Sequence, residues 1–274
     1  MALSLLTINI WNDDGPWATR LPLLQHWIAL LQPDVLLMQE VLRGPRLDQL
    51  ALLAPPGSHV AFAPMAPFWN DRTLEIGVAI ASRFPLLAQA QVALPTARAD
   101  DARCALGAAL ATPAGVWPVF TTHFSYWPTA AATRLDQAIA LAAFVRRTGD
   151  AWRSEFAAAA PLRLPDVVGG DLNERPDVDA VRFLTGRLAR DDARAGYLDA
   201  WAMAGAGAGE TMVAANPFVP RGVMPDGRID YVLAGLPARS DLGRISLCRR
   251  VLDLPVKGVH PSDHFGVYVE FETP

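Results

Sequence analysis

The alternation of apolar patterns in the first forty residues restricts the possible folds more than any other feature of the sequence. Residues 3–10 form a short apolar run rich in strand formers, which leads into the turn-forming residues 12–16. Residues 20–32 space their apolar side chains three and four positions apart, which predicts a helix with one buried face that Pro33 ends. Residues 35–39 (VLLMQ) are continuously apolar, as in a strand covered on both faces. The chain therefore begins as strand, helix, strand.

The rest of the chain continues with short strands and intervening helices. Further strands are expected at 74–81, 86–94, 104–111, 116–122, 166–170, 228–234 and 265–271. Further helices are expected at 46–53, 129–147 and 178–188. Because strands lie at both ends with helices between them, we expect one α/β domain over residues 1–274, with either a single mixed sheet or two sheets packed together.

Composition narrows the class of protein. The chain has 274 residues, of which 51% are hydrophobic and 19% charged, so it is too apolar for a disordered chain and long enough to bury a sizeable core. Its net charge is -4, and Lys257 is its single lysine. Proteins that bind long stretches of nucleic acid by neutralising phosphates usually carry the opposite sign of charge. Nucleic acid is therefore a disfavoured partner, although charge does not exclude it.

The cysteines and the apolar runs bear on the compartment. Cys104 and Cys248 stand alone, without a CxxC spacing, so we expect two buried thiols in a reducing compartment. The first residues have neither a basic region nor a small-residue cleavage site, and no uncharged apolar run reaches membrane-spanning length. We therefore expect a cytoplasmic protein without an integral membrane segment.

The polar residues that stand out share one placement, at or just beyond the end of an apolar strand. They are Asn9, Asn12, Glu40, His123, Asp171, Asn173, Asp230, Asp263 and His264. Because sheets collect strand ends along common edges, these side chains can converge on one cleft although they are far apart in sequence.

This set of residue types has a chemical logic. Carboxylates with an asparagine suit a hard divalent cation such as Mg²⁺ or Mn²⁺, which takes oxygen ligands. With two cysteines and no paired histidine motif, a structural zinc site is not expected. Histidines beside carboxylates suit proton transfer. A cation together with a His–Asp pair is the equipment for hydrolysing a phosphoester.

Each residue taken singly also has an ordinary structural explanation. Glu40 could be a helix cap or a surface charge, Asp171 and Asn173 could form an Asx-turn, and His123 could be a core histidine with its hydrogen bonds satisfied. Asp230 could pair with Arg228 within its strand. Only the combination of these residues favours a catalytic site.

The order of these motifs resembles the endonuclease/exonuclease/phosphatase superfamily. The matching segments are TINIWN, DVLLMQEV, LEIGVAIASRFP, TTHF, GGDLN, RIDYVL and SDHFG, and they run from the first strand to the last. The resemblance implies a four-layer sandwich of two packed mixed β-sheets flanked by helices. It also implies a metal-dependent hydrolase of ester bonds, in the class of phosphodiesterases, phosphatases and nucleases, with Mg²⁺ or Mn²⁺ as cofactor.

The resemblance assigns roles to individual residues. Glu40 would be the main metal ligand, with Asn9 and Asp263 completing or orienting its shell. Asp171 would position or deprotonate the attacking water, and Asn173 would donate to a phosphoryl oxygen.

The resemblance also implies an acidic partner for each of two histidines. Asp230 would orient His264, which would stabilise the transition state or act as the base. His123 would contact the phosphate with Glu75 as its orienting partner, although Ile76 here separates that acid from the glycine that directly follows it in the family pattern.

Three hypotheses for the function follow. The first is a phosphoesterase acting on a small or lipid-like phosphodiester or phosphomonoester, which Asn12 and Arg221 would help to bind. The second is a nuclease of the same fold. The third is a catalytically silent binding module. The presence of the full set of acidic and histidine residues argues against it. The sequence gives no indication of oligomeric state.

Overall fold

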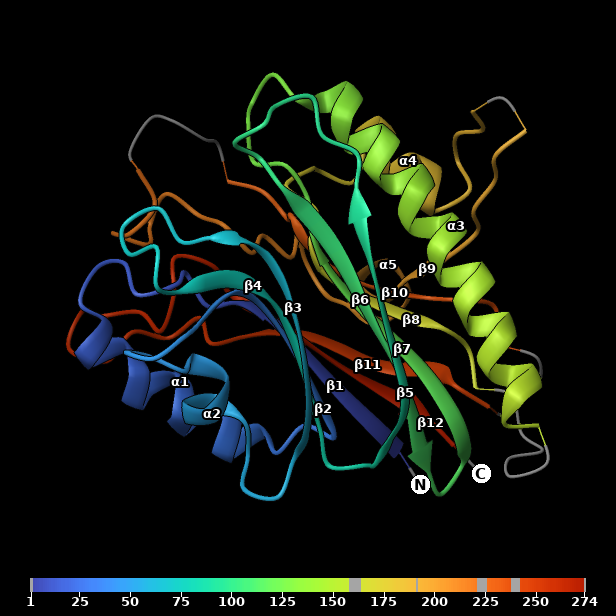
Figure 1. Ribbon diagram of the computed structural model, residues 1–274, viewed down its shortest axis with the longest axis horizontal. Helices are drawn as coiled ribbons and strands as arrows, with labels where there is room; N and C mark the ends of the chain where they lie inside the picture. Colours follow the sequence, from blue (N-terminus) through green and yellow to red (C-terminus); the bar gives the residue numbers. More distant parts are fainter. Residues whose placement is uncertain (1, 158–163, 191, 221–225, 238–241, 274) are drawn as a thin grey trace.

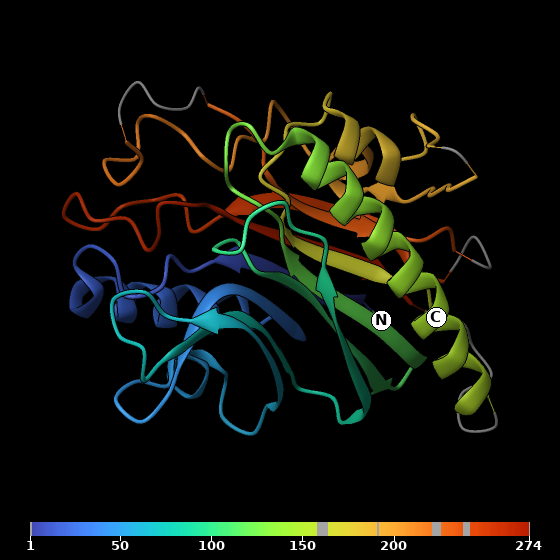
Figure 2. The same cartoon turned by 45° about the horizontal axis from the view of Figure 1, so that its top comes forward.

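Two six-stranded mixed sheets pack face to face, and helices cover their outer faces (Figure 1 and Figure 2). The computed structural model describes residues 2–157, 164–190, 192–220, 226–237 and 242–273. The predicted four-layer α/β sandwich is confirmed, and of the two arrangements left open by the strand pattern the protein adopts the one with two packed sheets.

The first sheet combines the two ends of the chain. Its strands, in spatial order, are β11 (Arg244–Val251), β12 (Gly266–Glu272), β1 (Ala2–Asn9), β2 (Val35–Arg43), β4 (Glu75–Ser82) and β3 (His59–Pro67). Only β1 and β2 run parallel, because helix α1 (Trp17–Leu31) connects them as a crossover. The helices α1 and α2 (Gln49–Leu53) cover its outer face, where Leu24 and Ile28 are buried against the sheet.

The second sheet is built from the middle of the chain. Its strands, in spatial order, are β5 (Leu86–Leu94), β6 (Arg103–Thr112), β7 (Gly115–His123), β8 (Val167–Asp171), β10 (Asp230–Ala234) and β9 (Leu198–Asp199). The long helix α3 (Ala131–Glu155) connects the parallel pair β7 and β8 and covers the outer face together with α4 (Asp179–Leu184). The short helix α5 (Ala200–Ala204) follows β9 and contacts β11 of the first sheet.

The core between the sheets depends on a close approach of β8 to the first sheet. Side chains from both inner faces, among them Leu5, Leu37 and Val119, are fully buried there. Gly169 leaves room for Leu37, since a Cβ at position 169 would lie 2.6 Å from Leu37 Cδ1. Because position 169 has no side chain, the two sheets can pack closely together near the end of β8.

Three strands were missed by the sequence patterns: β3 and β11, the edges of the first sheet, and the two-residue β9 at an edge of the second sheet. Strand β3 contains Pro64 and Pro67, and the apolar residues of β11 are interrupted by Ser246 and three arginines. Both have mixed burial, because an edge strand needs neither a continuous apolar run nor a complete set of ladder donors. The predicted strands of the sheet interiors were found because both of their faces are covered.

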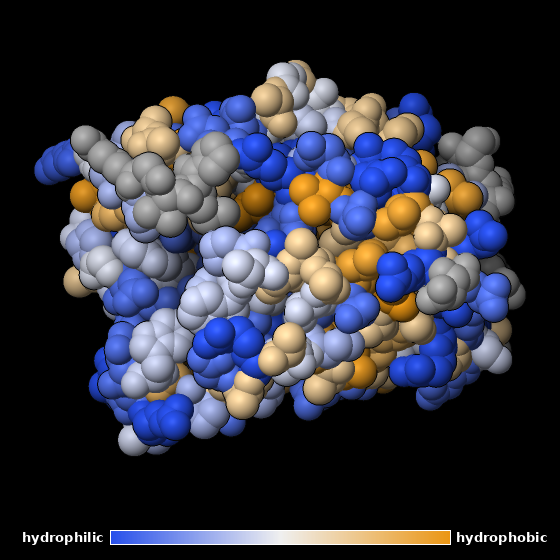
Figure 3. Space-filling model, turned by 90° about the horizontal axis from the view of Figure 1, so that it is seen from above, coloured by the Kyte–Doolittle hydropathy of each residue, from blue (hydrophilic) through white to orange (hydrophobic). Residues whose placement is uncertain are grey.

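The two ends of the described chain lie side by side, at the opposite end of β1 from Asn9. Ala2 pairs with Glu272, and β1 runs from there toward Asn9 (Figure 1). The surface seen from above mixes hydrophobic groups with hydrophilic residues (Figure 3). None of the helices in the described ranges is both long and apolar enough to cross a bilayer.

Candidate active site

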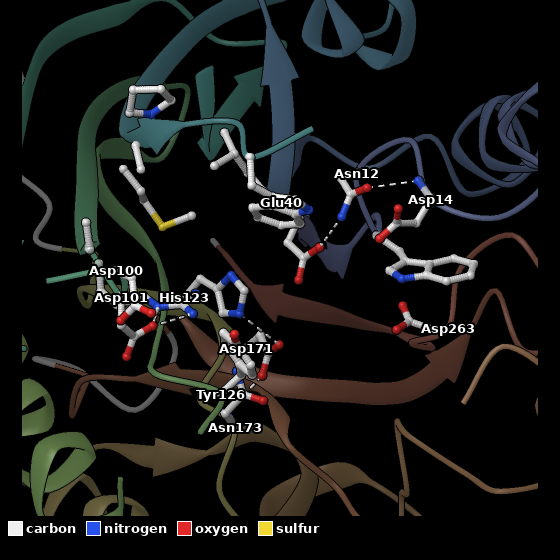
Figure 4. A pocket seen from close by; sticks show the side chains of 18 of the residues that line it. Asn12, Asp14, Glu40, Asp100, Asp101, His123, Tyr126, Asp171, Asn173 and Asp263 are labelled. Carbon is white, nitrogen blue, oxygen red and sulfur yellow. Dashed lines mark hydrogen bonds and ion pairs between the residues drawn. The ribbon is translucent and has the colours of Figure 1, made fainter. Parts of the chain in front are cut away.

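Three neighbouring strands of the second sheet bring a histidine and two aspartates into one row. His123 at the end of β7 is the register partner of Asp171 at the end of β8, and Asp171 is the partner of Asp230 at the start of β10. Because of this pairing, all three residues lie at the same end of the strands in the second sheet. That edge borders a cavity of about 1020 Å³, into which Glu40 and Asp263 of the first-sheet side also project (Figure 4).

Glu40 is aimed into the cavity by a β-bulge. We predicted that the strand ends before Glu40, but β2 continues to Arg43, and its pairing with β4 shifts register between Met38 and Val41. Glu40 has a φ of 59°, in the left-handed region that side chains rarely adopt outside functional or tightly held positions. The bulge redirects one side chain without ending the strand, which the apolar pattern alone does not reveal.

Two asparagine side chains hold the Glu40 carboxylate. Asn9 Nδ2 donates to Glu40 Oε1 at 3.1 Å, and Asn12 Nδ2 donates to Oε2 at 2.9 Å. Asn12 Oδ1 accepts the backbone N–H of Asp14 at 2.8 Å. Both ends of the Asn12 side chain thus make hydrogen bonds, so Asn12 positions Glu40, and it also lines the cavity where we expected it to bind substrate.

Asp171 lies at the centre of the cluster and is fully buried. Its Oδ2 accepts Asn9 Nδ2 at 3.1 Å and lies 3.4 Å from His123 Nε2. Its Oδ1 accepts the backbone N–H of Asn173 at 2.8 Å, so the Asx-turn that offered an ordinary explanation is present and also orients the carboxylate. Burial, together with the charge of Asp230, raises the Asp171 pKa to about 7.

His264 is held between carboxylates. Its Nδ1 is 2.9 Å from Asp230 Oδ2, and its Nε2 is 3.8 Å from Asp171 Oδ2. Burial alone would lower the pKa of His264, but Asp230, Asp263 and Asp171 raise it well above its ordinary value. The surrounding carboxylates therefore favour the protonated form of the imidazole. Arg228, the alternative partner of Asp230, instead pairs with Asp199 at 2.7 Å.

His123 does not have the acidic partner that the sequence predicted. Glu75 is exposed at the first position of β4, whereas its neighbour Ile76 lines the cavity. Adjacent strand residues point to opposite faces, so Glu75 faces away and Asp171 is the carboxylate next to His123. Burial and the charges of Arg103 and His264 hold the His123 pKa well below its usual range, which keeps this ring neutral.

The remaining expected residues fall into two groups. Asn173 and Asp263 line the cavity. Asn173 Nδ2 donates to the Phe124 carbonyl at 3.1 Å, and burial together with Glu40 raises the Asp263 pKa to about 6, against the opposing effect of His264. Arg221 lies outside the described residues.

Sequence reasoning missed Arg20, which ties the site loops together. Its buried guanidinium donates to five backbone carbonyls, those of Ile10, Trp11, Asn12, Asp14 and Pro261. It therefore joins the loop after β1 to the loop that carries Asp263 and His264. The available signal was its position four residues before Leu24, on the buried face of the predicted helix.

Asn216 acts on the second of these loops from another direction. It is fully buried, and its Nδ2 donates to the carbonyls of Ser262 at 2.9 Å and Asp263 at 3.1 Å. No sequence pattern distinguishes such an asparagine from an ordinary loop residue, because its partners are backbone atoms of a distant segment.

The donor set fits a hard divalent cation. Glu40, Asp171 and Asp263 present carboxylates to the cavity, where burial and neighbouring carboxylates raise the pKa values of the two aspartates and a cation would offset the negative charge. A second grouping, Asp171 with Asp230 and His264, has ligand atoms within 4.8 Å of one another. There, however, Asp230 and His264 bond to each other, so the open Glu40 side is the better fit.

Comparison with known proteins agrees with this geometry. The model of the Endonuclease/Exonuclease/phosphatase family matches residues 6–264, so the chain belongs to this family. Its members are hydrolases of phosphoester bonds and include nucleases and phosphatases, and this protein is an enzyme of that class. Both the predicted family and the predicted enzyme class are confirmed. A comparison with curated protein sequences found no match.

Solved structures share the fold at low sequence identity. D. rerio TDP2 complexed with a single-strand DNA product has a TM-score of 0.74 and 20% identity, covering 99% of both chains. An endonuclease/exonuclease/phosphatase from Beutenbergia cavernae DSM 12333 has a TM-score of 0.71 and 24% identity, covering 99% of this chain and 72% of that one. One from Bacteroides vulgatus has a TM-score of 0.70 and 18% identity, covering 100% of both.

Proposed function

We propose that the protein is a divalent-metal-dependent phosphoesterase that uses Mg²⁺ or Mn²⁺. Glu40 is the main metal ligand in this proposal, Asp263 a second, and Asn9 orients Glu40. The observation that carries it is the convergence of Glu40, Asp171 and Asp263 on one cavity beside His264. When bound, the cation would offset charge on the phosphoryl oxygens.

The protein's own groups divide the remaining work. In our proposal Asp171 holds the attacking water and accepts its proton, since its raised pKa makes it a better base than an ordinary aspartate. Protonated His264, oriented by Asp230, stabilises the charge that develops on the phosphoryl group. Neutral His123 contacts the phosphate, and the second N–H of the Asn173 amide is available to a phosphoryl oxygen.

We propose a small or lipid-like phosphodiester or phosphomonoester as substrate. The net charge of -4 and the single lysine support this choice, because gripping a long polyanion requires several cations. A nuclease is the second candidate. It is supported by the likeness in fold to D. rerio TDP2, whose structure holds a single-strand DNA product.

The site occupies one domain in this proposal, spanning residues 1–274. Support comes from the adjacency of β1 and β12, which places both ends of the chain in one sheet. We further propose a reducing compartment such as the cytoplasm, since Cys104 and Cys248 are buried free thiols.

A panel of phosphomonoesters, phosphodiesters, sphingomyelin, plasmid DNA and single-stranded DNA, each assayed with Mg²⁺ and with EDTA, tests the proposal. We expect turnover of a small or lipid-like ester that EDTA abolishes. Turnover that persists in EDTA would contradict the metal role. Cleavage confined to nucleic acid, with a rate that falls steeply as salt rises, would select the nuclease instead.

A further inference from the structure

The cavity continues beyond the catalytic residues along one apolar wall. Strand β3, the start of β4 and the segment between them supply this wall, which we name the apolar arm and define as Met65, Ala66, Pro67, Trp69 and Ile76. Ile76 is buried, whereas Trp69 is 59% exposed and packs on Phe68 with ring centroids 4.6 Å apart. The arm thus has a fixed base and an aromatic group at its open end.

The facing wall carries charge that is already neutralised. Arg103 and Asp101 form a buried ion pair at 2.7 Å, and Asp101 also accepts the hydroxyl of buried Ser125. The Arg103 guanidinium lies 5.3 Å from the ring centroid of Tyr126, which is 51% exposed. This wall therefore offers a second aromatic ring beside a neutral pair.

The charges that line the cavity limit what the arm can accept. Among the described residues, Arg72 and Arg103 are the only arginines or lysines in the lining, and Arg103 is paired with Asp101. Asp100 on the same side is paired with Arg98 at 2.9 Å, so this pair provides no free positive charge either. A nucleic-acid strand would bring a phosphate for every nucleotide past this wall, with one exposed arginine to meet them. An uncharged apolar group needs no cation to bind to this wall. Its binding also removes apolar surface from contact with water.

We propose that the apolar arm binds the apolar ester group of the substrate, aryl or alkyl, while the catalytic residues hold its phosphate. The inference rests on the proposed function, which places the phosphate beside Glu40 and Asp171. The cavity volume of about 1020 Å³ far exceeds a phosphate alone and leaves room for such a group. Trp69 and Tyr126 act as specificity-determining residues from opposite walls.

Binding of hydrolysis-inert phosphonates tests the proposal independently of turnover. The probes are methylphosphonate, phenylphosphonate and octylphosphonate, titrated into the Mg²⁺-loaded protein by calorimetry. We expect phenylphosphonate or octylphosphonate to bind at least about 10-fold tighter than methylphosphonate, because each buried methylene adds to affinity. The tighter of the two identifies the ester group as aromatic or aliphatic.

Variants assign the gain in affinity to the arm. Trp69→Ala and Tyr126→Ala should each remove at least about half of the preference for the larger probe and leave methylphosphonate affinity unchanged. Leu30→Ala is the matched control, since Leu30 is 64% exposed on α1 and does not line the cavity. Circular dichroism confirms that each variant is folded. Two substitutions on opposite walls keep the test decisive if one of them fails to fold.

The outcomes separate this inference from the proposed function. Equal affinities for the three phosphonates, or equal losses for all three in Trp69→Ala, would overturn the apolar arm. Methylphosphonate binding that is unchanged by EDTA and by Glu40→Gln would overturn the metal-dependent site instead. A thymidine hexanucleotide that binds tighter than both larger phosphonates, and that loses affinity in Trp69→Ala, would make the arm a nucleic-acid surface.

Discussion

At the scale of single residues, the Glu40 carboxylate is held by neutral side chains. Its two oxygens accept N–H groups from Asn9 and Asn12, which are neutral amides. A lysine or arginine in their place would fix the carboxylate equally well but would compete with a cation for its charge. The amide pair thus prepares a ligand without neutralising it.

Replacing Glu40 with Gln should therefore weaken metal binding before it affects anything else. We expect the apparent affinity for Mg²⁺ or Mn²⁺ to fall at least about 10-fold, with partial recovery of activity at excess metal. Activity measured against metal concentration checks this. Glu155→Gln at the end of α3 is the control and should match the wild type. A Glu40→Gln variant with unchanged metal dependence would remove Glu40 from the site.

Asp230 acts through His264. Its Oδ2 is 2.9 Å from His264 Nδ1, and its charge contributes to the raised pKa of that ring. In Asp230→Asn the side chain still accepts a hydrogen bond, but the charge is gone. The His264 pKa should fall, so the high-pH limb of the kcat/KM profile should move to lower pH, with at least about a tenfold loss of rate at neutral pH. A pH–rate profile that keeps its high-pH limb in this variant would contradict the assignment.

At the scale of elements, strand β8 positions the catalytic aspartate by means of its two glycines. Gly169 allows the sheets to meet, and a Cβ at Gly170 would lie 2.1 Å from the carbonyl oxygen of Thr122 on β7. Gly170 also has a φ of 156°, at the edge of the region that disfavours other residues. The strand can therefore lie close to β7 and bring Asp171 beside His123 only with glycine at this position.

Gly170→Ala should destabilise the fold by about 2 kcal/mol or more, because backbone must move to admit the methyl group. For a chain of this size that corresponds to a fall in Tm of roughly 4–8 °C. Gly196→Ala is the matched control, since a Cβ there meets no atom within 4 Å, and its Tm should stay within about 2 °C of the wild type. Equal melting temperatures for the two variants would show that β7 and β8 leave room for a methyl group at position 170.

The elements also show how far sequence patterns reach. Strands whose two faces are covered, such as β1 and β8, were predicted because burial on both sides leaves a continuous apolar run. The edge strands β3 and β11 and the bulge at Glu40 were not, since their conformation is set by neighbours in the sheet. Glu75, which the resemblance gave as the partner of His123, lies on the other face of β4, because one residue along a strand reverses the direction of the side chain.

At the scale of the whole molecule, the site concentrates acid groups that the metal-free protein must accommodate. The pKa values of Asp171 and Asp263 are raised to about 7 and about 6, and that of His264 lies well above its ordinary value. All three groups therefore hold protons in the folded state at a pH where the unfolded chain has lost them. When the unfolded state binds fewer protons, the free energy of unfolding falls as pH rises.

His123 and His260, whose pKa values are lowered, act in the opposite direction up to an unfolded pKa of about 6.5, so in EDTA we expect the Tm to fall from about pH 6.5 to pH 8. The aspartate contribution is lost as pH rises from the unfolded pKa toward about 7, and the favourable His264 contribution is lost as pH passes its raised folded pKa. Mg²⁺ should restore more stability at pH 8 than at pH 5, because it replaces protons on the carboxylates. Asp171→Asn should flatten the dependence. Thermal melts of both proteins check this, and a Tm in EDTA that rises over this range would refute it.

The sequence by itself determined the residue types of the site and most of the strands that carry them. Glu40, Asp171, Asp230 and His264 could be identified because each lies next to an apolar run that folds locally into a strand. Tertiary structure decided which side chains meet: Asp171 rather than Glu75 beside His123, and Asn12 on Glu40. It also decided the roles of Arg20 and Asn216, whose partners are backbone carbonyls. The physical reason is that strand formation depends on neighbours in sequence, whereas contacts depend on register, bulges and the packing of two sheets built from distant segments.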